Sequence, residues 1–106
     1  MGMHSNLLPF KLDDQSLRRL IREAAADTSR VWFVKHARQR MRERRITPAQ
    51  VFDCLRRGNL TEPGFVNSRG HWQCTLMRRC AGDDIHAVVA LERHENGDWV
   101  AVVTTF

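Results

Sequence analysis

The stretch that decides the fold is residues 71–105, HWQCTLMRRCAGDDIHAVVALERHENGDWVAVVTT. It contains three β-prone runs in which apolar and polar residues alternate, at 71–79, 85–93 and 99–105. Segments rich in Gly, Asp and Asn separate these runs, and the second segment carries Asn96-Gly97, a dipeptide typical of a tight β-hairpin. The pattern therefore predicts three antiparallel strands that are connected as a meander.

Alternation within these strands separates two faces of the predicted sheet. One face is apolar, and we expect it to meet the helices; it carries Trp72, Cys74, Leu76, Ile85, Ala87, Val89 and Leu91. The opposite face is polar and carries His71, Gln73, Thr75, Arg79, His86 and Glu92. The last strand is apolar on both faces until Thr104 and Thr105, which predicts a central strand that is covered on both sides.

Upstream of the meander lie a weak strand and a well-defined helix. Residues 59–67 are β-prone but contain Pro63 and Gly64, which predicts an edge strand or a bulge. Before them, Thr47-Pro48-Ala49-Gln50 is a strong helix start, because it places Thr at the N-cap, Pro at N1 and Gln at N3 of a capping box. The helix is expected to bury Val51, Phe52 and Leu55 and to end at Gly58, a typical C′ residue.

A short β-prone run at 31–34 is expected to join the same sheet. It leads into the basic segment 35–45, which lacks Gly, Pro and β-branched residues and so favours a helix. Ala37 and Met41 form its narrow apolar stripe. Beside that stripe, at i, i+4 and i+8, lie His36, Arg40 and Arg44, while Arg38 and Arg42 point elsewhere. The segment is therefore predicted to carry two cationic ridges.

A further helix is predicted to begin after Asp13 as N-cap, with Leu12 and Leu17 in a hydrophobic staple. Residues 1–11 are expected to form an extended lead-in. Together these patterns predict one α+β domain over residues 1–106, mainly helical over 12–58 and an antiparallel meander over 59–106. The helices should pack on one face of an antiparallel sheet of three to four strands.

Composition limits the class of protein. With 106 residues, 42% of them apolar and 27% charged, the chain is typical of one soluble domain. It has no apolar run near the roughly 18 residues that span a bilayer, and residues 7–10 are too short for a signal-peptide core. Three cysteines without a C-x-x-C pair argue against disulfides. We therefore expect a cytoplasmic protein.

A zinc site is the cofactor that the chain's own residues would suggest, through His71, Cys74, Cys80 and His86. Their spacing argues against it. His71 and Cys74 have opposite parity on their strand, and Cys74 and Cys80 are roughly 20 Å apart along an extended chain. We expect no metal and no other cofactor.

The net charge is concentrated in one place. The chain carries +5, and the segment 35–45 by itself carries six Lys or Arg side chains against Glu43. The rest of the chain is therefore neutral. Such a concentration is typical of a surface that binds a polyanion, most often nucleic acid. The alternative is a solvated basic helix face without a ligand.

Three blocks of the sequence carry a family resemblance: 36–47, with the pattern H-x-x-x-R-M-x-x-R-x-I-T, the helix end at 55–58, and the terminal strand at 99–106. They resemble a small bacterial family described as a domain of unknown function, over residues 31–106. Members of that family resemble the RelE and ParE toxins and the wider fold of barnase, EndoU, colicin and RelE ribonucleases. The resemblance implies a RelE-like fold and a toxin-type, metal-independent endoribonuclease.

Carried over to this chain, the resemblance implies catalytic roles for His36, Arg40, Arg44 and Thr104. Elementary chemistry supports the first three, because metal-free RNA cleavage needs a base for the 2′-hydroxyl and cations for the phosphorane. We expect further phosphate contacts from the neighbouring cations Lys35, Arg38, Arg42 and Arg45. Some RelE-type toxins use a Tyr, and this chain has none. His36 must then carry more of the proton transfer, or His86 must join it.

Each of these residues also has a structural interpretation. His36 can cap its helix, Arg40 or Arg44 can pair with Glu43 or Glu92, and Thr104 can be satisfied within its own sheet. The expected partners are RNA, free or ribosome-bound, and an acidic antitoxin-like protein; no membrane partner is expected. Two alternative functions stay open, a non-catalytic nucleic-acid-binding module and a protein-interaction module that uses the same basic helix.

Overall fold

The computed structural model describes residues 13–106. Its elements, in chain order, are α1 (Asp14–Ala25), the 3-10 helix η2 (Thr28–Arg30), β1 (Val31–Phe33), α2 (Lys35–Arg44), α3 (Pro48–Arg57), β2 (Asn59–Val66), β3 (Trp72–Cys80), β4 (Asp83–Arg93) and β5 (Trp99–Thr105). The α+β class is as predicted. The predicted lead-in at 1–11 and the staple partner Leu12 lie outside the described residues. No helix in the described part of the chain combines the length and apolar character that a membrane crossing requires.

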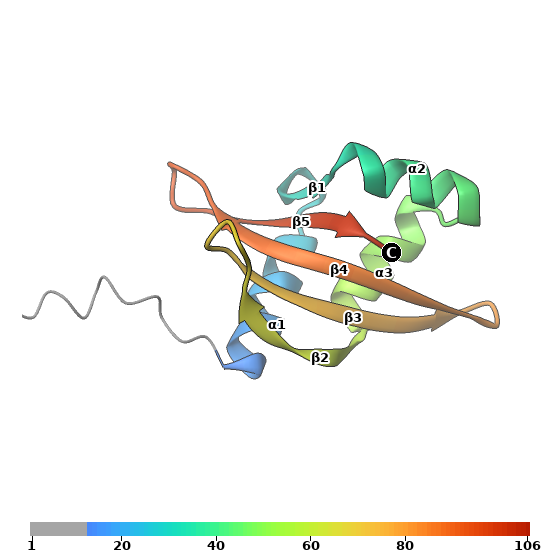
Figure 1. The fold of residues 1–106 in the computed structure, drawn as a ribbon, viewed down its shortest axis with the longest axis horizontal. Helices are drawn as coiled ribbons and strands as arrows, with labels where there is room; N and C mark the ends of the chain where they lie inside the picture. The colour runs from blue at the N-terminus through green and yellow to red at the C-terminus, as the bar shows by residue number, and fades with distance from the viewer. Residues whose placement is uncertain (1–12) are drawn as a thin grey trace, which may run out of the picture.

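The sheet has five strands in the order β1-β5-β4-β3-β2 (Figure 1). The sheet has more strands than the three to four predicted, and it is not antiparallel throughout. The three-residue strand β1 joins the sheet, as expected for the run at 31–34, but it pairs with β5 in parallel, with Val31 opposite Ala101 and Phe33 opposite Val103. The sheet is therefore mixed. Alternation within a strand indicates which face each residue occupies, but it carries no information on the direction of a partner strand.

The core lies between the helices and one face of the sheet. As predicted, this face carries Cys74, Leu76, Ile85, Ala87, Val89 and Leu91, all buried, and Trp72 packs against them. The helices contribute Leu17, Ile21, Ala37, Met41, Val51 and Leu55, also buried. In Figure 1, α1 and α3 lie behind the sheet, and α2 projects from the edge next to β1 and β5. The buried residues of the basic helix α2 are Ala37 and Met41, so its narrow apolar stripe packs against the core.

The opposite face of the sheet is open, since no helix among residues 13–106 covers it (Figure 1). β5 lies between β1 and β4, as predicted for a central strand, and Val100 and Val102 on this face are only 4% and 6% exposed, although no described helix covers them. Trp32 and Val34 on the same side are 47% and 37% exposed. On this face the apolar residues of β5 are thus buried, whereas Trp32 and Val34 are accessible to solvent.

Helix ends follow the predicted capping chemistry. The Asp13 carboxylate accepts a hydrogen bond from Ser16 N at 2.7 Å and begins α1. In the capping box of α3, Gln50 N donates to Thr47 Oγ1 at 3.2 Å and Thr47 N donates to Gln50 Oε1 at 2.9 Å. The helix ends at Gly58 as predicted, but Gly58 is its C-cap with φ −66° and does not adopt the left-handed conformation typical of a C′ glycine. A Cβ there would collide with the Cys54 carbonyl, and this close approach explains the glycine.

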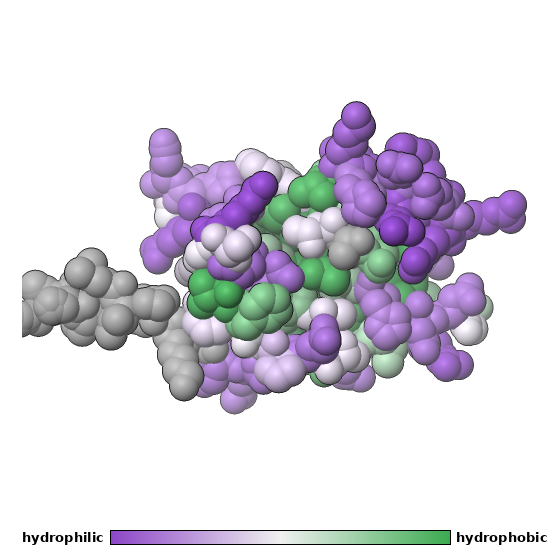
Figure 2. All heavy atoms as spheres, viewed as in Figure 1, coloured by the Kyte–Doolittle hydropathy of each residue, from purple (hydrophilic) through white to green (hydrophobic). Residues whose placement is uncertain are grey.

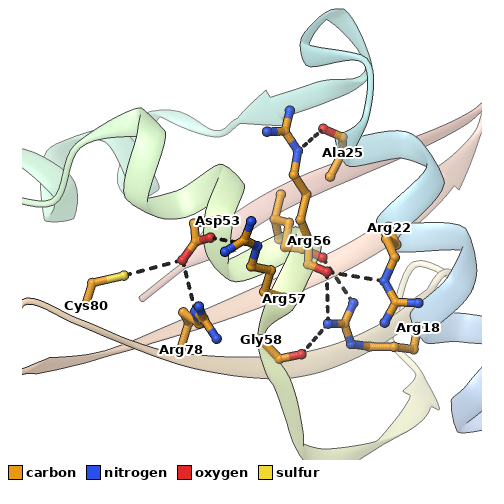
Figure 3. Close-up of polar contacts among 10 residues, drawn as sticks. Arg18, Arg22, Ala25, Asp53, Arg56, Arg57, Gly58, Arg78 and Cys80 are labelled. Carbon is orange, nitrogen blue, oxygen red and sulfur yellow. Dashed lines mark hydrogen bonds and ion pairs between the residues drawn. The ribbon is translucent and has the colours of Figure 1, made fainter.

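Arginines connect α1 and α3 at their ends (Figure 3). Arg18 donates to the carbonyls of Leu55, at 3.1 Å, and of Gly58, both at the end of α3. In return, Arg56 of α3 donates to the Ala25 carbonyl at the end of α1, at 2.8 Å. Burial lowers the pKa of the Arg18 guanidinium. These contacts supply donors for carbonyls that a helix end leaves without partners.

The edge strand β2 has the predicted irregularity. Its pairing with β3 shifts between Leu60 and Glu62 and again between Glu62 and Phe65, the region that contains Pro63. Proline has no N–H to donate, so an edge position accommodates it. The chain then returns to β3 through residues 67–71, a tight turn on the open side of the sheet.

Candidate nucleic-acid interface

The basic segment 35–45 is a solvent-facing surface. Its cations Lys35, Arg38, Arg42, Arg44 and Arg45 are exposed, and among the described residues none of these side chains has a hydrogen-bond or ion-pair partner. Arg40 approaches Glu43 at 3.9 Å, with side-chain exposures of 40% and 52%. An exposed pair at this distance contributes little to stability. Figure 2 shows these hydrophilic side chains gathered over α2, at the upper right.

Nearly all arginines elsewhere in the described chain have a partner within the protein. They donate to backbone carbonyls (Arg18, Arg22, Arg30, Arg56), pair with carboxylates (Arg19, Arg57, Arg78, Arg79) or lie over an aromatic ring (Arg93). Outside 35–45, Arg69 is the arginine whose side chain has no such contact among residues 13–106. The contrast separates structural cations from cations that are free to meet a ligand.

The two predicted ridges of α2 border different hollows. Arg38, Arg42 and Arg45 surround a shallow, largely apolar hollow of about 550 Å³. Met41 and Ile46 contribute to its apolar lining. Guanidinium groups around an apolar floor suit a ligand that has both an anionic and an apolar part, such as a nucleotide.

The ridge of His36, Arg40 and Arg44 reaches the β3–β4 hairpin at Arg44. Arg44 and His86 line a hollow of about 290 Å³ together with the terminal residue Phe106. Asp83 and Asp84 of the hairpin line it as well, so this hollow is less positive than the rest of the α2 surface. His86 is exposed, as its place on the polar face predicts.

A third hollow, of about 410 Å³, lies on the open face of the sheet and is lined by Thr104. The Thr104 hydroxyl donates to the Val88 carbonyl at 3.2 Å, which is the predicted structural interpretation of this residue. The same hollow is lined by His71 and Glu92. Figure 2 shows the open face, with apolar residues in its middle and hydrophilic residues around them.

The predicted catalytic residues are therefore distributed over the surface. His36, Arg40 and Arg44 share α2, Arg44 reaches the hollow of His86, and Thr104 lines the open-face hollow. His36 is exposed and lines none of these three hollows, and no described side chain orients it. These site assignments stay predictions.

Sequence reasoning missed one group of polar residues, around the turn 67–71. Asn67, Arg69, His71 and Glu92 come together at the open-face hollow. Asn-Ser-Arg-Gly is a typical turn sequence, and a His directly after it marks the start of β3. That local signal was available, but the pairing with Glu92 depends on the register of β3 and β4.

The cysteines are structural. Burial raises the pKa of the Cys54 thiol to about 11 and that of Cys74 to about 12, so both are protonated and unreactive near neutral pH. Cys80 is partly exposed, and its pKa is also raised. Within residues 13–106, His, Cys, Asp and Glu side chains form no cluster that could hold a metal ion.

Comparison with known proteins places the chain in one family. Neither a search of curated proteins nor a search of solved structures found a significant match. A family model described as "Domain of unknown function (DUF4258)" matches residues 33–106, which include α2, α3 and strands β2 to β5. Because the match spans well over half of the chain, the protein belongs to the DUF4258 family.

Proposed function

We propose that this protein binds single-stranded RNA through the basic segment 35–45. One observation carries the proposal: five of the six Lys and Arg side chains of this segment have no partner in the described structure, whereas almost every arginine elsewhere in residues 13–106 has an intramolecular partner. Unpaired like charges on one short helix repel one another, and phosphates would relieve that repulsion. The resemblance to RelE- and ParE-type toxins favours RNA as the polyanion.

The salt dependence of binding tests the proposal. If three to four phosphates are neutralised, the logarithm of the affinity should fall with the logarithm of the salt concentration at a slope of about −2 to −3. Replacement of Arg38, Arg40 and Arg42 together by Gln should flatten this slope by about 1 to 2. Fluorescence anisotropy of a labelled, unstructured RNA provides the measurement.

A matched control separates local from overall charge. Arg19, Arg57 and Arg79 are 62%, 69% and 70% exposed and pair with carboxylates away from the basic segment. Their replacement by Gln removes the same amount of charge, and the slope should keep its wild-type value within error. An equal loss in both triple variants would mean that net charge alone attracts RNA, and an unchanged slope in the first would remove α2 from the interface.

We further propose that the bound RNA is cleaved without a metal, as the RelE-like resemblance implies. The hollow at the end of α2 supports this, because the cation Arg44 and His86, one of the two predicted bases, both line it. His36 is the other. Cleavage should survive EDTA and leave a 2′,3′-cyclic phosphate, and DNA should be bound but not cut, since it lacks the 2′-hydroxyl nucleophile.

The cleavage assay uses purified protein with mixed RNA and, separately, with translating ribosomes, because a toxin of this kind can require a ribosome-bound message. No cleavage by the folded protein in either assay would leave the RNA-binding module standing alone. Salt-sensitive binding to an acidic protein, without binding to RNA, would instead support the protein-interaction module. In the toxin hypothesis, a small acidic protein encoded next to this one would be its neutralising partner.

A further inference from the structure

The open-face hollow has the features of a ligand site. Its floor includes Ala90 and Val102, which are only 3% and 6% exposed, and its rim is polar. Val34, the N-cap residue of α2, also lines it, so the hollow lies next to the start of the basic helix. Its volume of about 410 Å³ is within the range of pockets that hold small ligands, and it can accommodate one nucleotide.

A histidine and a carboxylate face each other at this rim. His71 Nδ1 lies 3.9 Å from Glu92 Oε2, and the two side chains are 34% and 29% exposed. Among residues 13–106, His71 is the histidine that has a carboxylate within 4 Å. At 3.9 Å the two groups are farther apart than a hydrogen bond allows, so Glu92 acts on the Nδ1 side of the ring through its charge and leaves Nε2 available to a substrate. Neither His36 nor His86 has such an orienting group.

An unpaired cation completes the group. Arg69 lines the same hollow, and its side chain has no partner among the described residues. Its backbone position is fixed, because Asn67 Oδ1 accepts hydrogen bonds from the N–H groups of both Arg69 and His71, each at 3.0 Å. Asn67 Nδ2 in turn donates to Gln73 Oε1 at 3.0 Å. Asn67 thus fixes the backbone from which both side chains extend.

We propose that the open-face hollow binds one nucleotide of single-stranded RNA and that His71 is the general base that cleaves it, with Glu92 orienting His71 and Arg69 holding the phosphate. The inference rests on the proposed RNA-binding function, because a strand that runs along α2 would reach the hollow at Val34. It places the base at His71 instead of His36 or His86.

The chemistry at this site is a transesterification. His71 Nε2 takes the proton of the 2′-hydroxyl, and the 2′-oxygen forms a bond to phosphorus. The bond from phosphorus to the 5′-oxygen breaks, and the leaving oxygen takes a proton from water. The products are a 2′,3′-cyclic phosphate and a 5′-hydroxyl, and His71 returns its proton to solvent. Arg69 stabilises the charge that develops on the phosphorane oxygens.

The structural alternative is a cross-strand pair that only stabilises the sheet. His71 adjoins the register pair of Trp72 with Leu91, so His71 and Glu92 are neighbours on adjacent strands. Such a pair contributes modestly to stability and would not affect a chemical step. Rescue by imidazole distinguishes the two roles, because added imidazole can replace a missing base but cannot replace a cross-strand contact.

The test combines RNA binding with cleavage of the same labelled RNA, in the assay format that reveals wild-type cleavage. His71→Ala should lower kcat roughly a hundredfold to ten-thousandfold and leave the RNA affinity within about twofold. Imidazole should restore part of the activity.

Arg69→Gln should lower kcat/KM by about a hundredfold or more without imidazole rescue. Glu92→Gln should lower kcat with little change in KM, and Glu92→Asp should recover part of the loss. Glu95→Gln, in the exposed β4–β5 turn, is the control and should cleave like the wild type.

The outcomes separate this inference from the proposed function. Wild-type cleavage that persists in a folded His71→Ala variant overturns the inference and returns the base to His36 or His86. RNA binding that depends on α2, without any cleavage, overturns the inference and leaves the proposed binding function intact. Absence of RNA binding overturns both. If His71→Ala fails to fold, as judged by circular dichroism, His71→Gln gives the same comparison with a polar side chain of similar size.

Discussion

The contacts between α1 and α3 allow a quantitative prediction about stability. Arg18→Met keeps the apolar stem of the side chain but removes its donors. In the native protein Arg18 donates to the carbonyls of Leu55, Arg56 and Gly58 (Figure 3). The Arg56 carbonyl also accepts from Arg22 at 3.2 Å and therefore keeps a donor. The substitution leaves two carbonyls at the end of α3 without their charged donor.

The expected magnitude follows from these two bonds. A hydrogen bond from a charged donor contributes about 1.5 kcal/mol at the lower end of its range, which suits this part-buried site. Two such bonds give about 3 kcal/mol. Burial of the guanidinium is itself unfavourable, as the lowered pKa of Arg18 indicates, and Met relieves that penalty in part. We therefore expect the free energy of unfolding to fall by about 2 kcal/mol.

Urea denaturation followed by circular dichroism measures this change. Arg19→Met is the control, because Arg19 is the next residue of α1, is 62% exposed and pairs only with Glu23, at 3.4 Å. Its replacement should change the free energy of unfolding by about 0.5 kcal/mol or less. If Arg18→Met loses no more stability than Arg19→Met, then Arg18 does not hold the end of α3 as these contacts indicate.

Three further predictions concern the core, the thiols and the basic helix. Leu55→Ala should lower the free energy of unfolding by about 2 to 4 kcal/mol, because Leu55 is fully buried, and a loss below about 0.5 kcal/mol in denaturation would show that α3 does not pack on the sheet. The free energy of unfolding should fall as the pH rises above about 8.5, because thiols in the unfolded chain then lose their protons, whereas Cys54 and Cys74 in the folded state have pKa values of about 11 and about 12. In denaturation experiments at a series of pH values, Cys74→Ala should make this fall with pH less steep. Arg40→Ala should weaken both RNA binding and any cleavage, whereas an effect on cleavage alone would argue against a ground-state phosphate contact.

Local chemistry made much of the fold predictable. The capping box at Thr47 and Gln50, the N-cap at Asp13 and the turn at Asn96-Gly97 depend on residues three or fewer positions apart, and the structure contains all of them. The apolar face of the sheet was likewise predictable, because side chains alternate with a period of two along any strand.

The direction of strand pairing was not predictable from these signals. The run at 31–34 was expected in the sheet, but no local signal indicates that β1 pairs with β5, far along the chain, in parallel. Gly58 shows the same limit. Its position after a helix indicated a left-handed cap, whereas the close approach of the Cys54 and Met77 carbonyls is the reason that no side chain fits.

The candidate sites likewise depend partly on the sequence alone and partly on the tertiary structure. The sequence by itself determined where the excess charge lies, because charge is a sum over residues, and it predicted the helix that presents this charge to solvent. Only the tertiary structure decided which arginines have an intramolecular partner and which do not, since each carbonyl or carboxylate partner comes from another part of the chain or another turn of the helix. It also brought His71 and Glu92 together, because the register of two antiparallel strands, and not their spacing in the sequence, sets which side chains face each other across a sheet.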